Sequence, residues 1–132
     1  MADEFYFHHR RGLPRWERIG HPLDTFTVIL CYAYLLAFSP TPAALVGFVA
    51  LATFSCLFVT KDEFVHAKLC SAGESWLHSI LFILHPVCFF VAARLWLDGQ
   101  GQVLFAGQSV IITGFLFYQI FYWGFYAAKP SQ

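Results

Sequence analysis

Four long apolar runs constrain this chain more than any other feature of its sequence. The runs cover about 22–38, 42–59, 74–97 and 103–128. A helix that crosses the hydrocarbon core of a bilayer needs about 20 mainly apolar residues, and roughly 17 suffice. Each run reaches this length. The sequence therefore predicts an all-α integral membrane protein, in which four transmembrane helices form one bundle in a single domain over 1–132.

The composition agrees with this prediction and excludes several functional classes. Hydrophobic residues make up 58% of the 132 residues and charged residues only 12%, which is about half the charged share of a soluble domain. Eight basic residues balance eight acidic residues, so no strong net field would attract a polyanion. These values exclude an ordinary water-soluble enzyme, a disordered tail and a nucleic-acid-binding arm.

The positions of the basic residues predict the orientation of the bundle. Four crossings place the N-terminal segment 1–21, the connection 60–73 and the C-terminus on the same side of the membrane. Seven basic residues lie on that side, and only Arg94 lies on the other. Because basic residues concentrate in short cytoplasmic loops, we expect both termini in the cytoplasm. If the protein is bacterial, its location would be the cytoplasmic (inner) membrane.

Histidines and acids gather at the predicted cytoplasmic ends of the spans, where pairs of them have helical spacing. Imidazole and carboxylate together suit iron, zinc or manganese. The sequence predicts a metal site at the cytoplasmic interface. Such a site would serve a metal-dependent oxidoreductase or hydrolase that acts on a lipophilic substrate. Its candidate ligands are Glu63, His66, Glu74, His78, His21, Asp24 and Asp62.

The third run carries a polar stripe that continues into the hydrocarbon layer. Glu74, His78 and His85 are separated by four and seven residues, which places them within about 40° of one another on a helix. Pro86 follows His85 and removes the main-chain donor that the carbonyl of Phe82 would otherwise receive. His85 is therefore a candidate cofactor ligand. Under this alternative the chain is a subunit of a membrane complex that binds haem b or a quinone.

Helix capping offers a different explanation for the same acids. Ser71–Glu74 and Thr60–Glu63 both match the S-x-x-E capping box, and the second box would begin a short interfacial helix over 61–70. Pro22 would occupy the first helical position of the first span, with Asp24 near the positive end of the helix dipole. Under this interpretation the acids are caps and not ligands.

Capping does not explain the two histidines inside the third run, His78 and His85. Each could bond to a hydroxyl or carbonyl of a neighbouring helix, which is a common packing device in membranes. The protein would then be a non-catalytic accessory membrane subunit, or a small transporter in which the histidines relay protons.

The fourth run is rich in aromatic residues, which occur on all sides of the predicted helix. We expect them to pack between helices and against lipid. The alternative is that they line a slot for a quinone, a haem edge or an acyl chain. The expected partners are the lipid bilayer, a second copy or a larger membrane complex, and a lipophilic small molecule.

Overall fold

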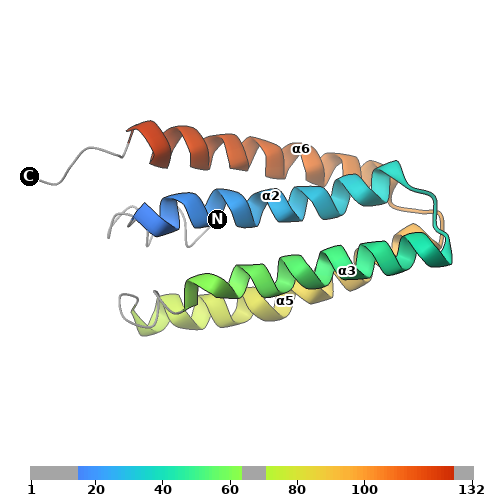
Figure 1. Cartoon of the computed structure of the whole chain (residues 1–132), viewed down its shortest axis with the longest axis horizontal. Coiled ribbons are helices and arrows are strands. Elements are labelled where there is room, and N and C mark those ends of the chain that lie inside the picture. The colour runs from blue at the N-terminus through green and yellow to red at the C-terminus, as the bar shows by residue number, and fades with distance from the viewer. Residues whose placement is uncertain (1–14, 64–70, 127–132) are drawn as a thin grey trace, which may run out of the picture.

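The computed structural model describes residues 15–63 and 71–126 of the chain, except for the side chains of Arg15 and Asp62. Four long helices account for most of this part (Figure 1): α2 (Arg15–Ala37), α3 (Pro42–Phe58), α5 (Ala72–Leu97) and α6 (Gln102–Tyr118). A 3₁₀ turn, η2 (Val59–Asp62), follows α3, and a π-helical segment, η3 (Gln119–Tyr126), continues α6.

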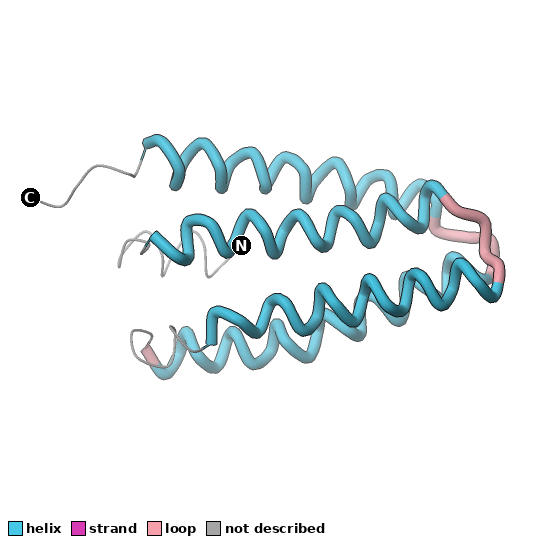
Figure 2. The backbone as a smooth tube through the Cα atoms, viewed as in Figure 1, coloured by secondary structure: helices cyan, strands magenta, loops and turns pink. Residues whose placement is uncertain are grey.

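The helices run alternately up and down, so the two short connections lie together at one end of the bundle (Figure 2). We call this end the loop end, and it holds residues 38–41 and 98–101. We call the opposite end the terminal end, and α2 and α5 begin there. The helix α2 packs along α6 and against α3, and α3 packs in turn against α5.

All four helical stretches are long and apolar enough to cross a membrane. Their bounds are Trp16–Ala37, Pro42–Lys61, Ala72–Leu97 and Gln102–Tyr126. Many large apolar side chains on their outer faces are exposed, including Val103, which is 87% exposed. A helix satisfies its own main-chain hydrogen bonds, so such a surface is stable against lipid. The prediction of four helices that are long and apolar enough to span a membrane is confirmed.

Both connections at the loop end contain the turn residues that the sequence suggests. Thr41 caps α3, because its hydroxyl accepts a hydrogen bond from the amide of Ala44 at 3.1 Å, and Pro42 follows at the first helical position. Gly99 and Gly101 adopt positive φ angles of 69° and 88°. Glycine reaches this left-handed region without a steric cost, so the chain reverses here within a few residues.

The bundle interior near the loop end is apolar and rich in aromatic rings. The ring of Tyr32 on α2 lies 6.1 Å from that of Phe89 on α5 and 6.2 Å from that of Phe105 on α6. Trp96, which is 1% exposed, donates its indole N–H to the carbonyl of Phe38 at 2.9 Å. This bond ties the last turn of α5 to the residue after α2. The loop half of the bundle is therefore a packed core.

The first helix begins earlier than the sequence analysis expects. Because α2 is already helical at Arg15, Pro22 lies inside the helix and not at its first position. Asp24 is therefore not in the first turn and does not cap this helix. A proline in a helix interior costs one main-chain hydrogen bond, but spanning helices tolerate it because neighbouring groups satisfy the backbone.

The two expected capping boxes have different outcomes. Ser71 accepts a hydrogen bond from the amide of Glu74 at 3.3 Å and caps α5. At the other box, the hydroxyl of Thr60 donates to the carbonyl of Leu57 at 2.7 Å, and the amide of Glu63 bonds to the carbonyl of Thr60. Thr60 thus continues α3 as a 3₁₀ turn and does not begin a new helix. Most of the expected interfacial helix over 61–70 lies outside the described residues.

Candidate functional site

Polar side chains from all four spans meet inside the bundle at one level, which we call the polar layer. It lies about 15–25 Å from the loop end, at 1.5 Å per residue. In a hydrocarbon core about 30 Å thick, this is the half nearer the terminal end. The layer consists of Thr25 and Thr27 on α2, Ser55 on α3, His85 on α5 and Gln119 at the start of η3.

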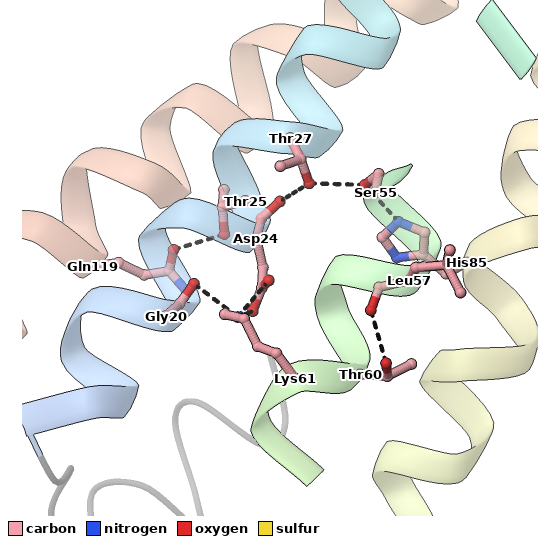
Figure 3. Close-up of polar contacts among 10 residues, drawn as sticks. All are labelled: Gly20, Asp24, Thr25, Thr27, Ser55, Leu57, Thr60, Lys61, His85 and Gln119. Carbon is pink, nitrogen blue, oxygen red and sulfur yellow. Dashed lines mark hydrogen bonds and ion pairs between the residues drawn. The ribbon is translucent and has the colours of Figure 1, made fainter. Parts of the chain in front are cut away.

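Three of these side chains form a chain of hydrogen bonds across three helices (Figure 3). The hydroxyls of Thr27 and Ser55 lie 2.8 Å apart, and both residues are buried. Ser55 Oγ lies 3.1 Å from Nε2 of His85. Thr27 Oγ1 also donates to the main-chain carbonyl of Asp24 at 2.8 Å. The ring of His85 further meets the ring of Phe89 edge-on, with centroids 4.8 Å apart.

A second bond joins the fourth span to the first. Thr25 Oγ1 donates to Oε1 of Gln119 at 2.7 Å, and Gln119 is 3% exposed. Gln119 is the first residue of the π-helical segment η3, and such segments frequently mark functional sites. Together with the first chain, this bond links every span of the bundle through side chains of the polar layer.

An ion pair lies between the polar layer and the terminal end. Lys61 Nζ lies 2.7 and 2.8 Å from the two carboxylate oxygens of Asp24, and both side chains are largely buried. The same ammonium is 3.5 Å from the carbonyl of Gly20 and 4.5 Å from the ring centroid of Phe58. Buried charges are stable only when they are paired and hydrogen-bonded. The pair therefore connects η2 firmly to α2.

The predicted metal ligands do not come together in the part of the chain that the structure describes. Within residues 15–63 and 71–126, no group of three or more histidine, cysteine or acidic side chains is placed to hold a metal ion. The carboxylate of Asp24 is bound by Lys61. His66 and the side chain of Asp62 lie outside the described part. A metal site that includes them stays a prediction.

The polar stripe of the third span points into the bundle. Glu74 is 2% exposed and His78 is 5% exposed, and His85 contacts Ser55 of the neighbouring helix. All three side chains thus lie on the packed side of α5 and not toward lipid. Carboxylates and imidazoles are rarely buried without a role or a partner.

Sequence reasoning missed one buried acid, Glu17, which is 0% exposed. It lies on α2, four residues before His21, at the same spacing that separates Glu74 from His78. The repeated E-x-x-x-H spacing could have revealed it. A helix that begins at Pro22 would leave Glu17 outside it, so the spacing has no meaning unless the helix begins earlier, as α2 does. The bonding roles of Ser55, Thr25 and Thr27 were also missed, since neutral polar residues give little signal in an apolar run, and so was the pairing of Lys61 with Asp24.

The aromatic residues of the fourth span stack along its outer side. Rings that are four residues apart lie 5.3–6.2 Å from each other, in one row of tyrosines and one row of phenylalanines. Between the rows is an open, apolar groove of about 360 Å³, which is lined by Phe117, Tyr118, Phe121, Tyr122 and Tyr126. A quinone, haem edge or acyl chain in this region stays a prediction.

The comparisons with known proteins add no further constraint. No protein-family model, curated protein or solved structure matches this chain.

Proposed function

We propose that this chain is an integral membrane protein with both termini in the cytoplasm, and that it acts as a small proton-coupled transporter. The orientation is supported by the seven basic residues that four crossings place on the terminal side, against one on the loop side. The terminal end of the bundle then faces the cytoplasm, and the polar layer lies in the cytoplasmic half of the membrane.

The observation that carries the proposal is the position of His85. Its ring lies where three helices meet and is hydrogen-bonded through Ser55 to Thr27. Histidine is the side chain whose charge ordinarily changes near neutral pH. In a low-dielectric interior, a proton gained or lost at this point changes the energy of helix packing by a large amount. Proton-driven transporters use intramembrane histidines and acids in this way.

The distribution of polarity supports access from one side. Between the polar layer and the loop end, the interior is the packed core around Phe89, Phe105 and Trp96. On the terminal side lie Glu74, His78 and the ion pair of Lys61 with Asp24. A proton would reach His85 through the polar half of the bundle, which under the proposed orientation is the cytoplasmic half.

Other titratable groups lie on the elements around His85. On α2 and at the end of α3, Asp24 and Lys61 neutralise each other. The thiols of Cys31 on α2, Cys56 on α3 and Cys88 on α5 and the phenol of Tyr32 on α2 are further titratable groups on these elements. On α5 itself, His78 lies about two turns nearer the terminal end. His85 is therefore the group whose charge would change at the helix junction.

The proposal is tested by following packing as the pH falls. Trp96 and Trp123 are buried, whereas Trp16 and Trp76 are exposed, so the part of the tryptophan fluorescence that depends on His85 reports changes in the interior of the protein in lipid nanodiscs. We expect a reversible change between about pH 8 and about pH 5. His85→Gln should remove it. Ser79→Ala, which removes only an exposed hydroxyl bonded to its own helix, should retain it. A wild type without the change, or a His85→Gln variant that keeps it, contradicts the proposal.

A metal-dependent function is the second candidate, and the repeated E-x-x-x-H spacing favours it. Glu17 with His21 and Glu74 with His78 begin at the same end of the bundle, and three of these four side chains are buried. If iron, zinc or manganese is bound there, Glu74→Gln should greatly reduce the metal content while helix content hardly changes, because glutamine keeps the capping role but loses the anionic oxygen. His78→Ala should act in the same way.

Elemental analysis of the purified protein decides this second candidate. Equal metal content in the wild type and both variants, or no metal in any of them, would exclude it. A visible absorption spectrum of the same sample tests the haem alternative. A Soret band that disappears in His85→Gln would make His85 an axial ligand, and would replace the proton-coupled function with a cofactor-binding one.

A further inference from the structure

The hydrogen bonds of the polar layer have a fixed direction. Each hydroxyl carries a single hydrogen, whereas a main-chain carbonyl can only accept. Thr27 Oγ1 lies 2.8 Å from the carbonyl oxygen of Asp24, so the hydrogen of Thr27 is used in that bond. Thr27 can therefore only accept in its 2.8 Å contact with Ser55.

The assignment of the hydroxyl hydrogens also decides whether His85 donates or accepts. Ser55 donates its hydrogen to Thr27, which leaves the Ser55 oxygen as an acceptor toward His85. The 3.1 Å contact between Ser55 Oγ and His85 Nε2 must use a hydrogen on Nε2. The direction of donation thus runs from His85 through Ser55 and Thr27 to the carbonyl of Asp24.

We propose that Thr27 and Ser55 are positioning residues that hold His85 in the Nε2–H tautomer and make Nδ1 its only proton-accepting atom. Among the described residues, none forms a hydrogen bond with Nδ1. In neutral imidazole one nitrogen donates and the other carries the lone pair, and the bond made by one nitrogen decides the state of the other. The lone pair of Nδ1 therefore receives a proton, or a hydrogen-bond donor of the transported solute.

This inference rests on the proposed function, because it names the atom at which the proton binds. It also explains how the hydrogen bond between Ser55 on α3 and His85 on α5 is kept when His85 is protonated. Both the neutral Nε2–H ring and the charged ring donate through Nε2, so the bond to Ser55 exists in both states. The charge changes at Nδ1 without loss of the hydrogen bond that positions the ring. Nε2 is the usual nitrogen for metal and haem ligation, and here it is engaged with Ser55.

Nitrogen NMR of the protein, labelled with ¹⁵N-histidine and placed in nanodiscs at pH 8, tests the assignment. Its reference is His85→Gln, which identifies the His85 signals by their loss. We expect the wild-type ring to carry its hydrogen on Nε2 in about tenfold excess, the preference that one directed hydrogen bond supplies. A wild-type ring with its hydrogen mainly on Nδ1, or an even mixture, overturns the inference.

The decisive variant is Thr27→Val, which removes the hydroxyl and keeps the shape of the side chain. Ser55 then loses its hydroxyl acceptor on α2, where the sulfur of Cys31 is the weaker alternative. Ser55 can donate to Nε2 instead, so the His85 hydrogen should move to Nδ1. Thr27→Ser should keep the wild-type tautomer. Thr25→Val is the matched control, because the Thr25 hydroxyl bonds to Gln119 and not to this chain. A Thr27→Val protein with the wild-type tautomer would overturn the positioning role.

The outcomes separate this inference from the proposed function. If the tautomer behaves as expected but the fluorescence does not respond to acid, the positioning of His85 stands and the proton-coupled function fails. If the acid response depends on His85 while its ring is a tautomeric mixture, the function stands and the positioning role fails. If Thr27→Val does not fold, the wild-type tautomer and the Thr27→Ser variant still decide the assignment.

Discussion

At the scale of single residues, the most exacting requirement is charge neutrality inside the bundle. Asp24 and Lys61 satisfy it together, because the ammonium contacts both carboxylate oxygens. A buried pair adds little net stability, since desolvation offsets most of the attraction, but removal of one partner is costly because the other then loses its opposite charge. The pair is therefore best understood as a requirement of the fold near the terminal end.

Replacement of Lys61 by methionine tests this reasoning. Lys61→Met keeps the length of the side chain but removes the ammonium that contacts both oxygens of the Asp24 carboxylate, which has a side-chain exposure of 12%. We expect a loss of about 3 kcal/mol in the free energy of unfolding. The double variant Asp24→Asn with Lys61→Met should recover most of it, because both members of the pair are then neutral. The measurement is unfolding in mixed detergent micelles. A double variant whose loss in unfolding free energy equals the sum of the losses in Lys61→Met and Asp24→Asn would contradict the explanation.

At the scale of the elements, the approach of α2 to α3 depends on one glycine. A Cβ built on Gly47 would collide with the hydroxyl of Tyr34, which donates to the carbonyl of Ala44 at 3.0 Å. The ring of Tyr34 also lies 4.4 Å from that of Phe38. The missing side chain at Gly47 lets the tyrosine lie flat on α3 and bond to its backbone.

Gly47→Ala should therefore displace the Tyr34 hydroxyl and destabilise the protein, even though alanine is the better helix former. We expect a cost of about 1–3 kcal/mol, the range for overpacking in a well-packed interior. Gly107→Ala is the matched control, because nothing lies within 4 Å of its Cβ position, and it should be neutral or slightly stabilising. Thermal unfolding in detergent compares them. Equal melting temperatures for the two variants would show that the Tyr34 contact is unimportant.

The number of the helices and the approximate bounds of the last three were predictable from sequence, whereas the early start of α2 and the contacts in the polar layer were not. Apolar length and turn residues such as Pro42 and Gly101 mark the spans, because the bilayer imposes both. The inward position of His78 on α5 follows from helical periodicity. The contacts between helices do not follow from periodicity. The pairing of Ser55 with His85, for example, depends on how α3 and α5 are rotated against each other.

At the scale of the whole molecule, polarity divides the bundle into two halves. The loop half contains an aromatic core that includes Phe48, Phe89 and Trp96. The terminal half contains the polar layer, the ion pair and the buried residues Glu74 and His78. Under the proposed transport function, the polar half would give access from one side of the membrane and the aromatic core would be the barrier on the other, as in one state of an alternating-access cycle.

The proposed orientation is tested with reporters on both sides of the membrane. A reporter fused after Gln132 should be active in the cytoplasm, and a tag inserted between Gly99 and Gln102 should be accessible from outside, because short basic loops remain in the cytoplasm. A tag inserted in the other short connection, 38–41, should behave as the one near Gly99 does. A reporter after Gln132 found outside, or a tag near Gly99 found inside, would contradict the orientation.

We propose that His85 exchanges its proton from the terminal side only. It is measured with protein inserted in one orientation into lipid vesicles, while tryptophan fluorescence is recorded as the pH is lowered on one side at a time. We expect acid on the terminal side to change the fluorescence within the mixing time and acid on the loop side to leave it unchanged. The variant His85→Gln should abolish the response. An equal response from the loop side, or a terminal-side response that persists in His85→Gln, would contradict it.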